Sequence, residues 1–116
     1  MDLSIIDILG DSLCIASEDG QKVHDAIAPE LRAGREVRLS FRKAEFTTTA
    51  FLNAAIGQLY GEFTEEQIEA ALTVCDASSD DLVIIGRVMA RSKQYFKDPK
   101  PFEAAYREIW GEDDDL

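Results

Sequence analysis

The sequence predicts a single α/β domain in which helices cover a β-sheet. Its 116 residues are the length of one ordinary domain. Its hydrophobic fraction of 46% is typical of a globular protein. Short β-like runs alternate with longer runs at helical spacing, the pattern of a sheet packed against helices. We expect one domain over residues 1–111 and a disordered acidic tail over residues 112–116.

The first third of the chain is expected to hold two strands and a helix. Residues 3–9, rich in Ile and Leu, predict a first strand, and residues 12–17 predict its partner in a short hairpin. Residues 21–33 predict a helix, because Val23, Ile27 and Leu31 recur at helical spacing. Pro29 allows a kink or a break within it, and Gly34 is expected just past its end.

The middle of the chain predicts a strand followed by a helix. Residues 36–41 alternate between apolar and polar side chains, with the period of a strand. Phe46 resumes the apolar set, so we expect it in the interior with Val37, Leu39 and Phe41. A helix over about 49–61 carries a broad apolar face, and beside it runs a row of small residues that permits close packing: Ala50, Ala54, Gly57 and Gly61.

Two capping patterns mark helix starts in the last half. Thr64 and Gln67 have capping-box spacing. Residues 68–76 fit either a helix or a strand, and we favour a strand near 72–75. Ser78 or Ser79 is expected to cap a helix reaching about residue 95, although the Val and Ile of residues 82–86 also suit a strand. A last helix is expected over 101–111.

The net charge of −11 argues against direct binding of nucleic acid. Residues 44–86 hold no Lys, Arg or His. This imbalance fits either solubility or a negative face that steers a basic partner. The acids expected on such a partner surface are Glu62, Glu65, Glu66 and Glu69.

The remaining patterns suggest a cytoplasmic protein without a cofactor. No stretch approaches the roughly 20 apolar residues of a membrane span, and the acidic N-terminus does not resemble a secretory signal. Cys14 and Cys75 are expected as buried thiols, since no zinc ligand set surrounds them. His24 is expected as a solvated helix residue without a partner. Because no nucleotide-binding, calcium or hydrolase motif is present, we expect no enzyme.

Three consecutive threonines stand where the strand pattern changes to the helix pattern. At such a junction the first backbone N–H groups of the helix lack partners, and a Thr hydroxyl caps one of them. The same position suits a phosphate on that hydroxyl. Thr47, Thr48 and Thr49 are therefore either a cap or a modification site.

The segment around these threonines resembles the STAS domains (sulphate transporter and anti-sigma-factor antagonist), and more closely the STAS-like family. The shared pattern is a strand, an apolar residue, a hydroxyl-bearing turn, an aromatic-Leu-Asn run and a Gly-x-Leu-Tyr helix end. Here these are Phe46, residues 47–49, residues 51–53 and residues 57–60. The resemblance covers residues 34–63 most closely.

The resemblance implies a mixed sheet of four or five strands backed by three or four helices, without catalytic residues. In the anti-sigma-factor antagonists of this fold, a partner ATPase of the histidine-kinase-like superfamily phosphorylates a Ser or Thr at this helix start. Thr49 matches that residue, and Thr48 precedes it. The usual Asp-Ser-Ser-Gly run is here Thr47-Thr48-Thr49-Ala50, without the acid and the glycine.

Two functions follow from these observations. The first is a regulatory protein-interaction module that binds a partner through residues 47–53, with Thr47, Thr48, Thr49 and Asn53 in its surface. The alternative is a small acidic inhibitor, for example phage-borne, that occupies a basic nucleic-acid-binding site on its target. An inhibitor of that kind should carry acids in a row at phosphate-like spacing. A switch should carry an exposed Thr turn beside an apolar patch.

Overall fold

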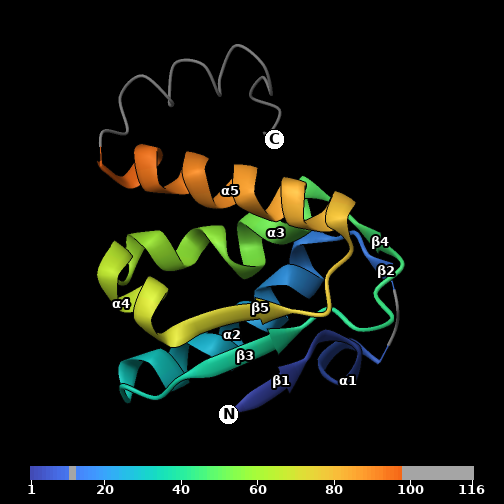
Figure 1. Cartoon of the computed structure of the whole chain (residues 1–116), viewed down its shortest axis with the longest axis horizontal. Coiled ribbons are helices and arrows are strands. Elements are labelled where there is room, and N and C mark those ends of the chain that lie inside the picture. Colours follow the sequence, from blue (N-terminus) through green and yellow to red (C-terminus); the bar gives the residue numbers. More distant parts are fainter. Residues whose placement is uncertain (11–12, 98–116) are drawn as a thin grey trace.

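The protein is an α/β fold built on two small parallel sheets (Figure 1). The computed structural model describes residues 1–10 and 13–97, which form five α-helices, one 3-10 helix and five strands. None of the helices in these two ranges is both long and apolar enough to cross a membrane. The last helix and the tail expected over 101–116 lie outside the described residues.

The larger sheet has three strands, β1 (Asp2–Ser4), β3 (Val37–Ser40) and β5 (Leu72–Cys75), with β3 in the centre. The smaller sheet pairs β2 (Leu13–Cys14) with β4 (Phe46–Thr47). All these pairings are parallel, so the single mixed sheet of four or five strands is not confirmed for the described residues. The expected hairpin is wrong, because β2 pairs with β4 and not with β1.

The first strand is shorter than the sequence predicts. It ends at Ser4, whose hydroxyl accepts a hydrogen bond from the N–H of Asp7 at 3.4 Å and begins α1 (Ile5–Leu9). Gly10, with φ of 73°, ends that helix in a left-handed conformation. A short apolar run does not distinguish a strand from a buried helix by its periodicity alone. Here the cap and the terminal glycine favour the helix.

Helix α2 (Ser17–Arg32) passes through Pro29 without a break. It ends in a Schellman motif, in which the N–H of Gly34 donates to the carbonyl of Leu31 at 3.0 Å. The N–H of Arg35 donates to the carbonyl of Glu30 at 2.9 Å. Gly34 has φ of 75°, so its expected place just past the helix is confirmed.

The expected helix over 49–61 is a short α-helix followed by a 3-10 turn. Helix α3 (Thr49–Ala55) leads into η1 (Gly57–Gly61). The capping box of Thr64 and Gln67 is confirmed at the start of α4 (Glu65–Ala71), and the strand expected near 72–75 is β5. Helix α5 (Ser79–Lys97) is capped by Ser78, whose hydroxyl accepts from the N–H of Asp81 at 3.1 Å, and residues 82–86 lie within this helix and not in a strand.

Helix α5 packs across α3 and η1, and α3 packs on α2 (Figure 1). The small-residue row allows this approach: a Cβ on Gly57 would lie 2.8 Å from the Oγ of Ser92 in α5. The central strand supplies Val37 and Leu39 to the core, both fully buried. Phe46 was expected with them, but its side chain is 62% exposed, because it belongs to the smaller sheet.

Candidate functional site

The three threonines occupy three different environments at the start of α3. Thr47 is the last residue of β4, and its hydroxyl oxygen is buried without a hydrogen-bond partner among the described residues. Thr48 is the N-cap of α3, and Thr49 is its first residue and is exposed. The strand-to-helix junction predicted for these threonines is therefore present, although only one of the three hydroxyls caps the helix.

Thr48 fastens the smaller sheet to the helix. Its hydroxyl oxygen accepts from the N–H of Phe51 at 3.2 Å, and its O–H donates to the carbonyl of Ile15 at 2.7 Å. Its own N–H donates to the carbonyl of Cys14 at 3.0 Å. Because this hydroxyl already donates and accepts, a modification there would break the cap and the link to β2. Of the two threonines on α3 and its cap, Thr49 is the exposed residue, whereas Thr48 is partly buried.

Three exposed apolar side chains stand beside this turn. Leu13 is 38% exposed, Ile15 48% and Phe46 62%. Leu13 and Phe46 are direct partners in the register of β2 and β4, and Ile15 receives the hydrogen bond from Thr48. We call these residues the β2–β4 patch. The sequence did not reveal it, because Phe46 was grouped with the apolar residues of the preceding strand and expected in the interior.

Asn53 lies on α3 four residues after Thr49, and both are exposed. Residues four apart share one face of an α-helix. The hydroxyl and the amide therefore lie along one face of α3. Thr49, Asn53 and the β2–β4 patch form the candidate interaction site.

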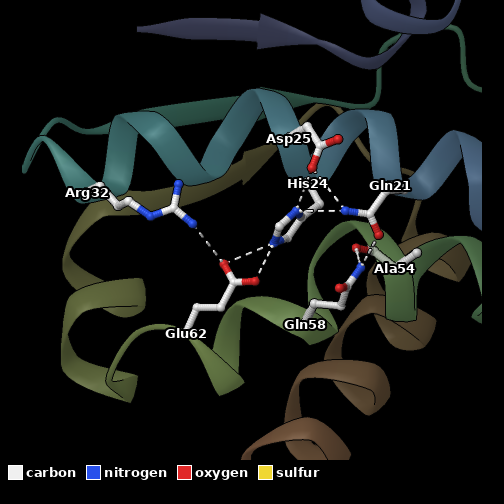
Figure 2. A network of polar contacts seen from close by, with 7 residues as sticks. All are labelled: Gln21, His24, Asp25, Arg32, Ala54, Gln58 and Glu62. Carbon is white, nitrogen blue, oxygen red and sulfur yellow. Dashed lines mark hydrogen bonds and ion pairs between the residues drawn. The ribbon is translucent and has the colours of Figure 1, made fainter.

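The acidic residues predicted as a partner surface lie elsewhere, over η1 and α4. Glu62 follows η1. Nε2 of His24 lies within hydrogen-bonding distance of both its carboxylate oxygens, 3.1 Å from Oε1 and 3.0 Å from Oε2 (Figure 2). Arg32 approaches the same carboxylate at 3.6 Å. The expectation that His24 is solvated and lacks a partner is wrong, since its residue is only 6% exposed. Its position three residues before Ile27 places it beside the apolar face of α2, and this spacing was the available signal.

The His24 contacts belong to a polar network that ties α2 to η1 (Figure 2). Nε2 of Gln58 donates to Oε1 of Gln21 at 2.8 Å and to the carbonyl of Ala54 at 2.7 Å. Hydrogen bonds from His24 and Gln21 lower the pKa of Asp25, which is solvent-exposed. No Ser, Thr or Cys stands among the seven residues drawn, so the network contains no hydroxyl or thiol nucleophile.

The other acids are bridged by a base from α5. Nζ of Lys93 lies 3.0 Å from Glu69 and 3.4 Å from Glu65. The hydrogen bond with Glu69 is the main cause of the raised pKa of Lys93. Glu66 is exposed. The structure thus brings Arg32 and Lys93 to a segment that has no base of its own.

Neither metal ligands nor a disulfide occur in the part of the chain that the structure describes. No group of three or more His, Cys, Asp or Glu residues within 1–10 and 13–97 has the arrangement of a metal site. Cys14 is buried, Cys75 is partly buried, and neither forms a disulfide within the described residues.

Comparison with known proteins gives one match. A family model described as a STAS-like domain of unknown function matches residues 19–82, from α2 to the start of α5. The match includes all three threonines and confirms the resemblance seen in the sequence. No curated protein and no solved structure matches the chain.

Proposed function

Because the chain belongs to the family of STAS-like domains of unknown function, we propose that it is a regulatory protein-interaction module that binds its partner through the Thr49 end of α3. The observation that carries this proposal is the exposed Thr49 beside the exposed Phe46 of the β2–β4 patch. Covering an apolar side chain that is more than half exposed removes it from water, and this favours binding of the partner. The exposed amide of Asn53 adds a hydrogen-bonding group to the same surface.

The Thr49 hydroxyl is the switch of this module. A phosphate there adds a charge of about −1.5 to −2 and three acceptor oxygens. Burying that charge against the partner requires its desolvation, so phosphorylation opposes docking on the patch. Thr48 is the poorer acceptor, because its hydroxyl both caps α3 and holds Ile15.

The partner class follows from the resemblance to the anti-sigma-factor antagonists. An ATPase of the histidine-kinase-like superfamily would both bind the surface and phosphorylate Thr49. The acid and the glycine of the usual phosphorylated run are missing here, so the partner's active site would have to accept Thr47 and Ala50 in their places.

The contacts of the acids weaken the alternative of an acidic inhibitor. Such an inhibitor needs a row of unpaired carboxylates at phosphate-like spacing. Glu62 is held by His24 and Arg32, while Glu65 and Glu69 share Lys93. These contacts would have to break before the carboxylates could bind a basic target.

The test measures partner affinity for four single variants. The partner is captured with the parent chain from cells that produce it, purified, and titrated by calorimetry. Thr49→Glu and Phe46→Ser should each weaken binding by about 1–3 kcal/mol, whereas Thr49→Ala should bind like the parent. Phe96→Ser is the matched control, because Phe96 is also 45% exposed but lies near the end of α5. Thermal melts of all variants establish that they fold.

Two results would count against the proposal. Equal affinity of Phe46→Ser and the parent would place the interface away from the β2–β4 patch. Equal affinity of Thr49→Glu and the parent would leave the interface in place but remove the switch.

A further inference from the structure

We propose that the hollow at the carboxyl ends of β1, β3 and β5 binds a small molecule that carries a phosphate or carboxylate next to hydroxyl or ammonium groups. The hollow has a volume of about 500 Å³. Besides Ile6, it is lined by polar residues from three segments that are distant in the sequence: Ser4, Asp7, Ser40, Arg42, Lys43 and Asp76. Small-molecule sites commonly measure roughly 300–1,000 Å³. The carboxyl ends of parallel strands are a common place for ligands in α/β proteins.

The strand register aligns the floor of this hollow. Ser4 is the last residue of β1 and pairs with Ser40, the last residue of β3. Ser40 pairs in turn with Cys75, and Asp76 follows directly. Neighbouring strands lie about 4.8 Å apart. The two hydroxyls and the carboxylate therefore emerge side by side at one edge of the sheet, where the three arrowheads point in Figure 1.

The floor is held in place by hydrogen bonds that leave capacity for a ligand. The hydroxyl of Ser40 donates to Oδ2 of Asp76 at 2.7 Å and accepts from the N–H of Arg42 at 3.2 Å. The hydroxyl oxygen of Ser4 accepts from the N–H of Asp7, so its proton is available to an acceptor. The carboxylate of Asp76 can accept further hydrogen bonds, because each of its oxygens has two lone pairs. Arg42 and Lys43 form no ion pair with the described residues, although the charge of Arg42 adds to the Ser40 hydrogen bond in lowering the pKa of Asp76.

Backbone strain is concentrated around the same hollow. Among the described residues, Lys43 (φ 66°) and Asp76 (φ 60°) are the two non-glycine residues with positive φ. Lys43 is the third residue of a turn that the N–H of Ala44 closes on the carbonyl of Phe41 at 3.0 Å. That position favours glycine or asparagine. Residues held in this conformation cluster at functional sites, which is consistent with a role for Lys43 in the hollow.

The charges specify the ligand chemistry. Arg42 and Lys43, beside two hydroxyls, suit an oxyanion such as phosphate or carboxylate. Asp7 and Asp76 repel a bare anion but accept hydrogen bonds from hydroxyl or ammonium groups. The site should therefore select a molecule with both features over a simple anion. This inference does not depend on the proposed protein partner.

The test uses three probes of known composition: glycerol 3-phosphate, O-phosphoserine and inorganic phosphate, at constant ionic strength. Amide signals of the ¹⁵N-labelled full chain are followed during each titration. At least one organic phosphate should shift the signals of residues 4–7, 40–43 and 76 to saturation. Inorganic phosphate should bind roughly tenfold more weakly, a difference of about 1.4 kcal/mol.

Two variants and a control assign the binding to the hollow. The double variant Arg42→Gln/Lys43→Gln should bind the organic phosphate roughly tenfold more weakly than the parent, or weaker still. Arg91→Gln, on an exposed position of α5, should leave its affinity unchanged. Lys43→Gly should also weaken binding, yet it should raise the melting temperature because glycine relieves the strain at φ 66°.

Three results would overturn the inference. The first is that none of the three probes shifts the amides around the hollow. The second is that the double variant binds as tightly as the parent or the Arg91 control. The third is that inorganic phosphate binds as tightly as the organic phosphates, because the flanking carboxylates would then confer no selection.

Discussion

Thr47, Thr48 and Thr49 have the same side chain, but each hydroxyl meets a different surrounding. The hydroxyl of Thr47 is buried and unpaired among the described residues, that of Thr48 makes two hydrogen bonds, and Thr49 is exposed. A buried polar group without a partner destabilises the folded state, whereas a paired one stabilises it. Substitutions of equal size at neighbouring positions should therefore act in opposite directions.

We expect Thr47→Val to raise the free energy of unfolding by up to about 1 kcal/mol, because it removes an unpaired hydroxyl and suits a strand. Thr48→Val should lower it by about 1–2 kcal/mol, because the cap of α3 and the bond to Ile15 are lost. Urea melts of both variants and the parent measure the difference. If Thr47→Val is as destabilising as Thr48→Val, the Thr47 hydroxyl has a partner in solution.

Asp76 should make the stability of the fold depend on pH in the acid range. The hydrogen bond from Ser40 holds the pKa of Asp76 below its usual 3.8. A carboxyl whose pKa is lowered by folding stabilises the folded state above pH 3.8, and this contribution disappears as pH falls through the folded pKa. Ser40→Ala should remove it, because the main cause of the shift is lost.

The measurement is the difference in free energy of unfolding between the parent and Ser40→Ala at several pH values. The difference should be constant near neutral pH and should shrink as the solution is acidified below about pH 4. Thr73→Ala, an exposed change on the neighbouring strand β5, is the control and should show no such trend. If the difference for Ser40→Ala is the same at every pH, the hydrogen bond between Ser40 and Asp76 does not make stability depend on pH.

At the scale of elements, two helical glycines offer a matched comparison. A Cβ on Gly57 would lie 2.8 Å from the Oγ of Ser92, whereas nothing lies within 4 Å of a Cβ on Gly86 in α5. Gly57→Ala should destabilise the fold by about 1–3 kcal/mol through overpacking between η1 and α5. Gly86→Ala should stabilise it by roughly 0.5–1 kcal/mol through helix propensity. Denaturant melts decide, and equal effects would show that the small-residue row does not set the spacing of these elements.

Element boundaries could be predicted from the sequence where the signal is local. Gly34, Thr64 and Ser78 mark ends and starts that the structure confirms, because each makes hydrogen bonds within a few residues of itself. The run over residues 5–9 and the position of Phe46 could not be predicted in this way. The secondary structure of residues 5–9 and the exposure of Phe46 depend on which distant strand each segment pairs with. Local periodicity does not contain that information.

In the candidate site, too, the sequence predicts what depends on local signals and not what depends on distant pairing. The start of α3 at Thr48 and Thr49 followed from the change of period, and it is present. The β2–β4 patch joins segments that lie about 30 residues apart in the chain, as the pairing of Leu13 with Phe46 shows. The hollow beside Ser40 likewise joins three separate strands, and the contact of His24 with Glu62 joins two helical segments. Only the three-dimensional pairing of the elements brings these groups together.

Across the whole molecule, the fold redistributes charge that is uneven along the chain. Residues 44–86 carry eight acids and no base in a chain of net charge −11. Arg32 from α2 and Lys93 from α5 reach three of these acids. In contrast, Arg42 and Lys43 stand at the edge of the larger sheet without an ion pair to the described residues. Asp7 and Asp76 line the same hollow, so that edge offers a small molecule charges of both signs, although the chain as a whole is negative.

Parallel pairing in the larger sheet also determines when the chain can fold. Leu3 pairs with Leu39 and Leu39 with Val74, so the two pairings span 39 − 3 = 36 and 74 − 39 = 35 positions. Each must close a long loop before it gains any contact, which slows folding relative to a hairpin. During synthesis, β1 and β3 would both wait for residues 72–75 to leave the ribosome before the sheet is complete. A ribosome-bound chain that exposes residues only up to 64 should remain sensitive to protease, and one that exposes residues 1–97 should become resistant.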